Sequence, residues 1–307
     1  MASVANTGIT YKVVGLGEIL WDLLPAGPQL GGAPSNFAYS ASLLGDHGIA
    51  ASRLGDDPLG REAREQLTRL HLSTAYLQTD AQHPTSTVNV NLDANGQACF
   101  EFAESVAWDF LEWTPAWREL AVQADAVCFG SLAQRAPASC TTIQNFLRAM
   151  RPDALRVFDV NLRRPFFTPE VIARSLELAT ILKVNHEELP RLLGILGLAA
   201  ADDCSSARRL VELHDVQLVC VTRGARGSLI VNRKGEVSEH PGFRVPIADT
   251  VGAGDAFTAA LVHEHLRDAP LDRMNESANR MGAWVASQAG GMPIPKSNLA
   301  QALSAIR

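Results

Sequence analysis

Short apolar runs recur along the chain and alternate with longer segments whose apolar residues follow a helical period. The short runs are apolar almost throughout, which is typical of β-strands that are covered on both faces. They comprise residues 13–17, 126–130, 157–161, 181–185, 218–222 and 229–232. Strands that alternate with helices in this way predict an α/β fold built on one doubly wound, mainly parallel sheet that is flanked by helices.

Several helical segments have readable ends. Residues 34–44 begin with a proline and are stopped by Gly45. Residues 58–70 begin with a proline directly after Asp57, and residues 168–178 open with Thr-Pro-Glu. Proline in the first turn, a capping side chain before it and glycine after the last turn are the usual boundaries of a helix, so these three segments are predicted to be helices.

One region departs from this alternation. Residues 87–92 alternate polar and apolar side chains, residues 93–96 have the turn sequence Asp-Ala-Asn-Gly, and residues 99–102 alternate again. This pattern predicts a β-hairpin with one buried and one exposed face. We expect the hairpin to project from the main sheet and to pair with residues 20–29, so that a small β-sheet lid forms from about residues 18–32 and 84–104.

Composition and charge restrict the class of partner. The chain has 307 residues, of which 47% are apolar, and this is enough for a sizeable core. Its 27 basic and 33 acidic residues give no electrostatic footprint for a nucleic acid or an anionic membrane. No repeat or long linker interrupts the chain, so we expect one domain over residues 1–307 and a small-molecule partner.

Cysteine usage and the N-terminal sequence bear on the compartment. The five cysteines are at positions 99, 128, 140, 204 and 220. None forms a C-x-x-C pair, and Cys128 and Cys220 lie in apolar runs, as reduced thiols do. The chain shows no secretory signal pattern and no run of the ~18 apolar residues that a membrane span needs. The sequence therefore predicts a cytoplasmic protein.

A glycine-rich turn carries the strongest candidate chemistry. The residues Gly252, Ala253, Gly254 and Asp255 directly precede a helical segment, residues 256–265. Glycines at a helix start let the backbone approach a ligand, and the free N–H groups there favour phosphate. Phosphoryl transfer also needs a base near the attacking hydroxyl, and Asp255 follows the turn. Taken alone, the same residues also fit a simple tight turn with a carboxylate at the helix start.

Two motifs together carry a resemblance to a known family. The segment 249–255, Asp-Thr-Val-Gly-Ala-Gly-Asp, resembles the C-terminal signature D-T-x-G-A-G-D of the ribokinase/PfkB family of sugar kinases. The segment 31–36, Gly-Gly-Ala-Pro-Ser-Asn, is similar to the family's N-terminal G-G-A-x-x-N. The resemblance extends from about residue 13 to the last helix. It implies a ribokinase-like fold and ATP-dependent transfer of a phosphoryl group to a sugar hydroxyl, with Asp255 as the catalytic base.

The resemblance also implies a sugar site. Asp22, shortly after the first strand, would accept hydrogen bonds from vicinal hydroxyls. Gly32 would let the backbone approach the sugar, and Asn36 would offer it a donor and an acceptor. Asn161 and Arg163 follow a strand, at the sheet edge where ligands bind, and similarity to fructokinases implies that they face the sugar and the transferred phosphate.

The nucleotide site is implied by two further elements. The segment 183–188 fits the family's N-x-x-E element, in which Asn185 and Glu188 organise Mg²⁺ and the phosphates through water. The loop 222–227 resembles the one that lines the nucleotide, and its implied contacts are Thr222, Gly224 and Gly227.

The C-terminal part departs slightly from the family pattern. Residues 283–293 are expected to close over the adenine, but Gly290 and Gly291 stand where Gly-Ala is more usual. The adenine contacts therefore stay open, as does a K⁺ site near Asp249.

Several alternatives stay open at this level. The chain lacks the P-loop pattern and the dinucleotide-binding glycine pattern, which excludes those two mechanisms. Residues 18–25, 31–38 and 159–166 look most like bacterial fructokinase, so fructose is the first choice of acceptor. The alternatives are 2-keto-3-deoxygluconate kinase, ribokinase, nucleoside kinase and, in another class, a non-catalytic sugar or nucleotide sensor. A homodimer through the lid and a monomer are both compatible with the sequence.

Overall fold

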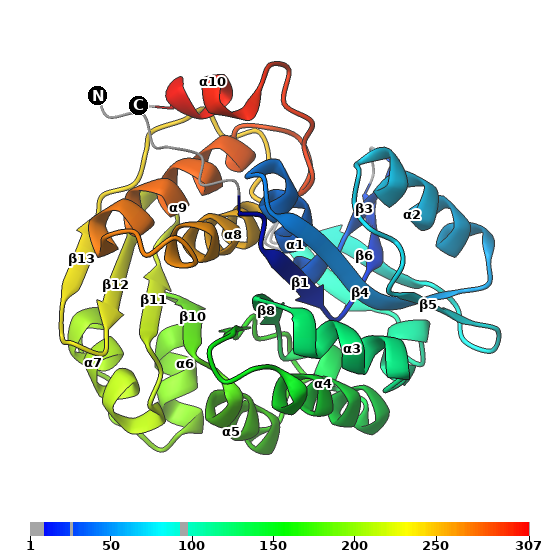
Figure 1. The fold of residues 1–307 in the computed structure, drawn as a ribbon, viewed down its shortest axis with the longest axis horizontal. Coiled ribbons are helices and arrows are strands. Elements are labelled where there is room, and N and C mark those ends of the chain that lie inside the picture. Colours follow the sequence, from blue (N-terminus) through cyan, green and yellow to red (C-terminus); the bar gives the residue numbers. More distant parts are fainter. Residues whose placement is uncertain (1–8, 25–26, 93–97, 307) are drawn as a thin grey trace.

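The computed structural model describes residues 9–24, 27–92 and 98–306 (Figure 1). Within these residues the chain forms a large sheet with helices on both faces and a separate small sheet at one side. The predicted α/β architecture is therefore confirmed. Among the described residues, none of the helices combines the length and the apolar character that a membrane span requires.

The main sheet has the strand order β13-β12-β11-β10-β9-β8-β1-β4-β5. Its strands are β1 (Lys12–Leu16), β4 (His47–Gly55), β5 (Leu77–Asp80), β8 (Ala126–Phe129), β9 (Leu155–Asp159), β10 (Ile181–Asn185), β11 (Leu218–Thr222), β12 (Ser228–Asn232) and β13 (Val237–His240). All neighbouring pairs from β5 to β11 are parallel, and only β12 and β13 join in antiparallel pairs. The sheet is thus mainly parallel, as the unbroken apolar runs predicted.

Three strands of this sheet have no counterpart among the predicted ones. They are β13, which pairs with β12, and β4 and β5, which pair with each other and join the sheet through β1. The sequence of β4 is rich in glycine, alanine and serine, and Ile49 is its one β-branched residue, so the signal that marks a strand is weak. Strand β4 forms because Ile49, Ala50 and Ala51 are buried between the helices.

Helices cover both faces of the main sheet (Figure 1). They are α1 (Ala33–Leu43), α2 (Pro58–Arg69), α3 (Pro115–Gln123), α4 (Pro137–Ala149), α5 (Pro169–Leu178), α6 (Glu188–Ile195), α7 (Asp203–His214), α8 (Ala253–His265), α9 (Leu271–Ala286) and α10 (Leu299–Ser304). Successive strand residues serve opposite cores, because Val13 packs with α1, α8 and α9 whereas Val14 packs with α3 and α4. The chain is therefore doubly wound.

The predicted helix boundaries agree with the structure to within about a turn. The side chain of Asp57 accepts a hydrogen bond of 2.7 Å from the amide of Gly60, which caps α2. Thr168 caps α5 in the same way through the amide of Val171. These caps satisfy amides that have no acceptor inside the helix, which is why the helices begin there.

The small sheet has the order β3-β2-β6-β7 and consists of β2 (Leu20–Leu24), β3 (Gly27–Gly31), β6 (Ser86–Leu92) and β7 (Ala98–Phe102). The antiparallel pair of β6 and β7 confirms the predicted hairpin, and β6 pairs with β2 as expected. The predicted turn at residues 93–96 lies outside the described residues. Trp21 and Leu30 on one face of this sheet pack with Tyr39 of α1, which anchors the small sheet to the main body. Its movement as a lid stays a prediction.

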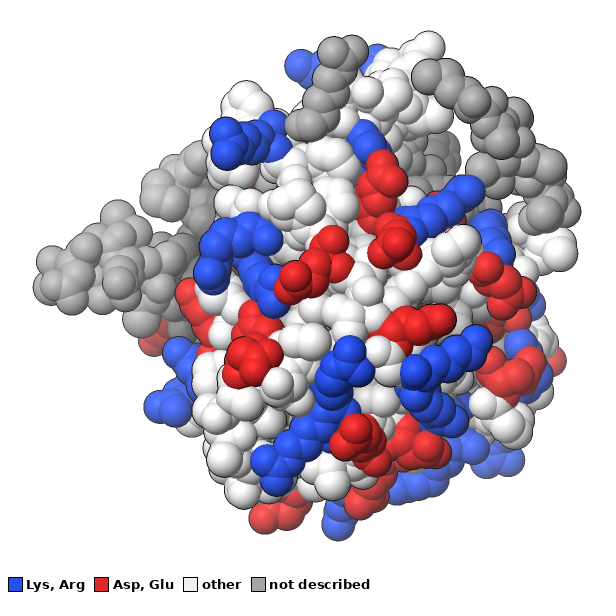
Figure 2. Space-filling model, turned by 90° about the vertical axis from the view of Figure 1, so that its left-hand side faces the viewer, with Lys and Arg blue, Asp and Glu red and all other residues white. Residues whose placement is uncertain are grey.

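Charged side chains of both signs are interspersed over the face shown in Figure 2. Opposite charges therefore lie beside one another there and partly cancel each other's field.

Candidate functional site

One cavity of about 760 Å³ brings the two sequence motifs together. The predicted site residues that line it are Asp22, Gly32, Asn36, Asn161, Arg163, Asn185, Thr222, Gly224, Gly227, Gly252, Ala253, Gly254 and Asp255. They come from the small sheet, from the carboxyl ends of the main strands and from the starts of α1 and α8. Two predicted residues, Glu188 and Asp249, do not line the cavity. The volume is in the range of ~300–1,000 Å³ that is typical of small-molecule sites.

Helix α8 begins at Ala253, three residues earlier than predicted, so the glycine-rich turn forms the first turn of the helix itself. Gly252 precedes it with a φ of 74°. A Cβ at this position would lie 2.6 Å from the Cα of Gly291, so only glycine fits without a shift of the backbone. The first amides of a helix have no acceptor inside it and carry positive partial charge, so this turn suits a phosphate.

Asp255 lies in that first turn and contacts the N-terminal motif. The Nδ2 of Asn36 donates a hydrogen bond of 2.9 Å to the Oδ2 of Asp255. Burial raises the pKa of Asp255, while the Asn36 bond and the charges of Lys183 and Arg163 act in the opposite direction. A carboxylate with a raised pKa is a stronger base, which suits a group that must accept a proton from an alcohol.

Lys183 and Asp159 form a buried ion pair below the glycine-rich turn. The Nζ of Lys183 lies 2.9 Å from the Oδ2 of Asp159, and only 7% of Lys183 is exposed. A Cβ at Gly254 would lie 3.2 Å from this Nζ, so the ammonium group is directly beside the turn. Burial lowers the pKa of Lys183, but the carboxylates around it outweigh this effect and raise the pKa, so that Lys183 stays charged. The ammonium group of Lys183 therefore places a positive charge directly beside the turn, and the carboxylate of Asp159 lies farther along the same pair and offsets part of it.

Glu18 is a second buried carboxyl group in the same cavity. It is 3% exposed, and its Oε2 has no hydrogen-bond partner among the described residues. Burial raises its pKa to about 7. Glu18, Lys183 and Asp159 were not among the site residues predicted from the sequence. The one available signal was a charged residue inside or directly after an apolar strand, where an unpaired charge is costly.

The small sheet contributes Asp22 from β2. Burial raises the pKa of Asp22 to about 6, and the charge of Arg163 opposes this rise. The backbone next to Asp22 in the cavity is close-packed, because a Cβ at Gly32 would lie 2.5 Å from the carbonyl oxygen of Glu18. The small sheet and the residue that follows it thus contribute a carboxylate, Asp22, and a glycine, Gly32, to the lining of the cavity.

Asn161 follows β9 with a φ of 39°, which is uncommon for a residue other than glycine. The hydroxyl of Ser131 donates hydrogen bonds to the carbonyl oxygens of Val160 and Asn161, at 2.8 and 3.3 Å. These bonds hold the loop in the unusual conformation, and from it Asn161 and Arg163 line the cavity while Leu162 packs in the core.

Glu188 connects two loops at the carboxyl edge of the sheet. Its Oε1 accepts a hydrogen bond of 2.9 Å from the amide of Leu162, and its Oε2 accepts one of 3.1 Å from the amide of Asn185. The Oδ1 of Asn185 accepts in turn from the amides of Glu187 and Glu188. Glu188 therefore fixes the loop that carries Asn161 and Arg163, a contact that the sequence did not reveal.

The donor set next to this edge fits Mg²⁺ held through water. Within the described part of the chain, no three His, Cys, Asp or Glu side chains converge as a metal site made of protein ligands alone would require. Mg²⁺ commonly uses one or two carboxylates together with water and substrate phosphates. Each oxygen of Glu188 accepts one N–H bond and has the capacity for a second.

The other end of the cavity is more apolar. Phe243, Val245 and Ala283 line it together with the loop after β11. In this loop Gly227 has a φ of 77°, and a Cβ there would lie 1.9 Å from the carbonyl oxygen of His240.

Asp249 accepts hydrogen bonds from the amides of Val251 and Gly290 and so joins the glycine-rich turn to the segment after α9.

A helix start whose free amides suit a phosphate, a buried carboxyl group beside it and a polar end formed by a second sheet are an arrangement suited to phosphoryl transfer to a small hydroxyl compound. The chain belongs to the pfkB family of carbohydrate kinases, whose model matches residues 28–297. The predicted family and the predicted enzyme class are therefore confirmed.

Known relatives agree over most of the chain. The fructokinase of Escherichia coli is 32% identical over 304 residues, which cover 92% of this chain and 96% of the relative. The fructokinase of Klebsiella pneumoniae is 34% identical over 262 residues, which cover 82% and 83%. The crystal structure of the Vibrio cholerae fructokinase in a form with bound fructose, ADP and calcium matches with a TM-score of 0.80 and 26% identity, over 96% of this chain and 98% of that chain.

Proposed function

We propose that this carbohydrate kinase transfers the γ-phosphoryl group of ATP to the 6-hydroxyl of fructose. The observation that carries the proposal is the contact between Asn36 and Asp255, which joins the small-sheet end of the cavity to the phosphate-favouring start of α8. The E. coli and Klebsiella relatives are fructokinases, and the Vibrio cholerae structure contains fructose and ADP.

The geometry supports a division of roles. Asp22 and Asn161 bind the sugar hydroxyls, and Arg163 neutralises charge on the transferred group. Asp255 takes the proton of the 6-hydroxyl group of the sugar. The oxygen of that hydroxyl group then forms the new bond to the γ-phosphorus, and the bond between this phosphorus and ADP breaks. The amides of residues 252–254 and the ammonium of Lys183 stabilise the charge that develops on the phosphoryl oxygens.

We place ATP along the apolar end of the cavity, with its phosphates toward the glycine-rich turn. Thr222, Gly224 and Gly227 form the wall on that side. Asn185 and Glu188 would hold Mg²⁺ through water, and the ion would supply positive charge against the phosphates. We also propose a K⁺ ion near Asp249, which activation of the enzyme by KCl would test. A homodimer that forms through the small sheet is a further proposal, and light scattering tests it.

The deciding experiment measures ADP release with ATP and each of four acceptors: fructose, ribose, 2-keto-3-deoxygluconate and adenosine. We expect the highest kcat/KM with fructose. A clear preference for another acceptor would assign the chain to one of the alternative kinases. Binding of sugar and ATP without any ADP release would instead support a non-catalytic sensor.

A further inference from the structure

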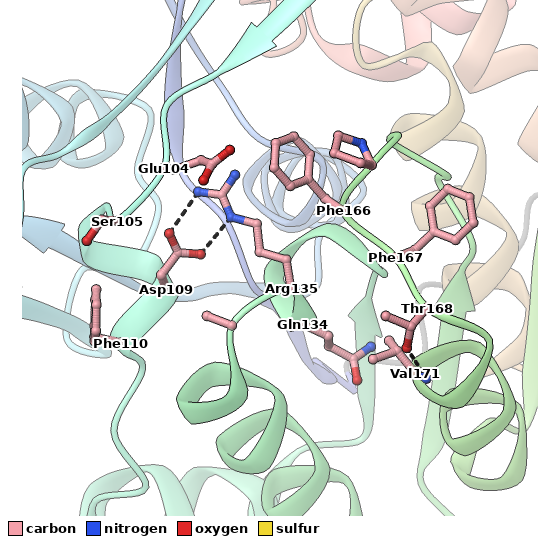
Figure 3. Close-up of a pocket in the computed structure, with 12 residues that line it drawn as sticks. Glu104, Ser105, Asp109, Phe110, Gln134, Arg135, Phe166, Phe167, Thr168 and Val171 are labelled. Atoms are coloured by element: carbon pink, nitrogen blue, oxygen red, sulfur yellow. Dashed lines mark hydrogen bonds and ion pairs between the residues drawn. The ribbon is translucent and has the colours of Figure 1, made fainter.

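A second cavity of about 350 Å³ lies beside the one described above (Figure 3). It is bounded by the segment after β7, by the turn before α4 and by the loop between β9 and α5. The aromatic rings of Phe110, Phe166 and Phe167 line it together with polar side chains such as Glu104 and Thr168. Its volume is within the range of small-molecule sites.

Two aromatic rings separate the cavities. Phe102, at the end of β7, lines the large cavity together with Asp22 and Arg163. Phe166 lines the second cavity. The rings meet edge to face, with their centroids 5.8 Å apart and an interplanar angle of 78°. Phe102 therefore has the proposed sugar site on one side and is supported by Phe166 on the other.

Arg135 holds Phe166 in this position. Its guanidinium lies 4.7 Å from the ring centroid of Phe166 and 4.1 Å from that of Trp108, so it is stacked between the two. Asp109 accepts two hydrogen bonds from the guanidinium, at 2.7 and 2.8 Å, as Figure 3 shows. The carbonyl oxygen of Ala103, next to Phe102, accepts another at 2.6 Å. Arg135 thus contacts the ring of Phe166 and the backbone next to Phe102. Because its bidentate pair with Asp109 fixes the guanidinium, Arg135 restrains the positions of both rings.

We propose that Phe166 is a specificity-determining residue: by supporting Phe102 it closes the sugar site against the second cavity and so restricts the acceptor to a single small sugar. Removal of the Phe166 ring leaves Phe102 without support and joins the two cavities. An acceptor with a substituent remote from the phosphorylated hydroxyl then extends into the second cavity. The inference rests on the proposed function, because it takes fructose as the acceptor that fits the closed site.

The test compares Phe166→Ala with the unmodified protein on fructose and on sucrose, whose fructosyl unit keeps a free 6-hydroxyl and carries a glucosyl unit at C2. The bonds formed and broken, and the proton transfer to Asp255, are the same for both acceptors. We expect the ratio of kcat/KM for sucrose to kcat/KM for fructose to rise by about tenfold or more in the variant, the usual scale for a change in pocket size. Both values come from one protein sample, so a loss of folded protein cancels in the ratio.

Phe167→Ala is the matched control. Phe167 lines the second cavity too, but Figure 3 shows its ring directed away from the Arg135 guanidinium. We expect this variant to keep the acceptor ratio of the unmodified protein. Phe166→Leu, which keeps an apolar side chain of smaller size, is expected to give an intermediate ratio.

An unchanged ratio in Phe166→Ala, or an equal rise in Phe167→Ala, overturns the inference. Failure of the proposed function has a different signature, because the unmodified protein then shows no preference for fructose in the first place.

Discussion

Asn36 and Asp255 are 219 residues apart in the chain and are joined by a hydrogen bond of 2.9 Å. The bond connects the first helix after the small sheet with the helix that begins at the glycine-rich turn. It also leaves the Oδ1 of Asn36 buried without a hydrogen-bond partner among the described residues. Because a buried oxygen usually has a hydrogen-bond partner, we expect a donor group of the acceptor sugar to pair with it.

Replacement of the proposed base should affect turnover far more than sugar binding. Asp255→Asn keeps the size of the side chain but removes its ability to take a proton. We expect kcat to fall by about 10²- to 10⁴-fold while the dissociation constant of the sugar changes little. Steady-state kinetics and calorimetric titration with the sugar measure the two quantities. Near-normal turnover in this variant would refute the role of Asp255.

The bond from Asn36 should set the pH dependence of the reaction. It stabilises the ionised form of Asp255, so its removal in Asn36→Ala raises the pKa of that carboxyl group further. The base must be ionised to act, so the acidic limb of the profile of kcat/KM against pH moves to higher pH. A hydrogen bond to a charged group contributes about 1.5–3 kcal/mol, so we expect a measurable displacement of this limb. A profile that falls evenly at all pH values would show that Asn36 acts in another way.

The ion pair of Lys183 and Asp159 should contribute separately to stability and to catalysis. Lys183→Met leaves Asp159 buried and unpaired, and we expect a loss of about 3–5 kcal/mol in the free energy of unfolding. In the double variant Lys183→Met/Asp159→Asn neither position of the pair carries a charge, so much of the lost stability should return. The turnover should stay about 10²- to 10³-fold low in both, because the positive charge beside the turn is absent. Recovery of activity together with stability would show that the pair has only a structural role.

The conformation of Gly252 should be required for nucleotide binding. In Gly252→Ala the new side chain has an unfavourable φ of 74°, and its Cβ would lie 2.6 Å from the Cα of Gly291. The left-handed conformation alone costs about 1–2 kcal/mol, so we expect a larger loss than this in the free energy of unfolding. We also expect a higher KM for ATP. Gly45→Ala is the control, because Gly45 has a φ of 97° but nothing within 4 Å of the added Cβ. This variant should lose stability and keep the KM for ATP. Equal effects of the two changes on that KM would argue against the proposed turn.

The protonation of Glu18 should make stability depend on pH. Its pKa is about 7 in the folded protein against an ordinary value of 4.5, so the folded protein holds a proton in this interval that the unfolded chain has lost. The contribution of Glu18 to stability therefore decreases as the pH rises from 4.5 to about 7. Glu18→Gln removes this effect and should gain stability over the unmodified protein with rising pH in urea unfolding. The exposed Glu119 supplies the control, since Glu119→Gln should show no such trend.

The parts of the fold that could be predicted from the sequence are those with a strong local signal. The strands β10 and β11 were predicted with their observed bounds because each is an apolar run between polar ends. The hairpin was predicted because its two strands alternate strictly. Strand β4 was missed, since its small side chains acquire their strand conformation from the helices that pack on them.

The candidate site divides in the same way. The glycine-rich turn and Asn36 belong to motifs that are readable along the chain. The ion pair of Lys183 and Asp159 joins neighbouring strands that are separated by an entire helix, so it depends on sheet register. The edge-to-face contact between Phe102 and Phe166 likewise joins the small sheet to a loop of the main sheet, and no local sequence pattern predicts it.

The path of the chain between the two sheets has a mechanical consequence. The chain leaves β1 to form β2 and β3, returns through α1 to β4 and β5, leaves again for β6 and β7, and returns to η1, a short helical turn at Ala107–Phe110. Four covalent crossings therefore connect the small sheet to the main body. A rotation of the small sheet as a rigid body would therefore require backbone rotation at all four crossings, and the small sheet is more restrained than an arm that is tethered at one point.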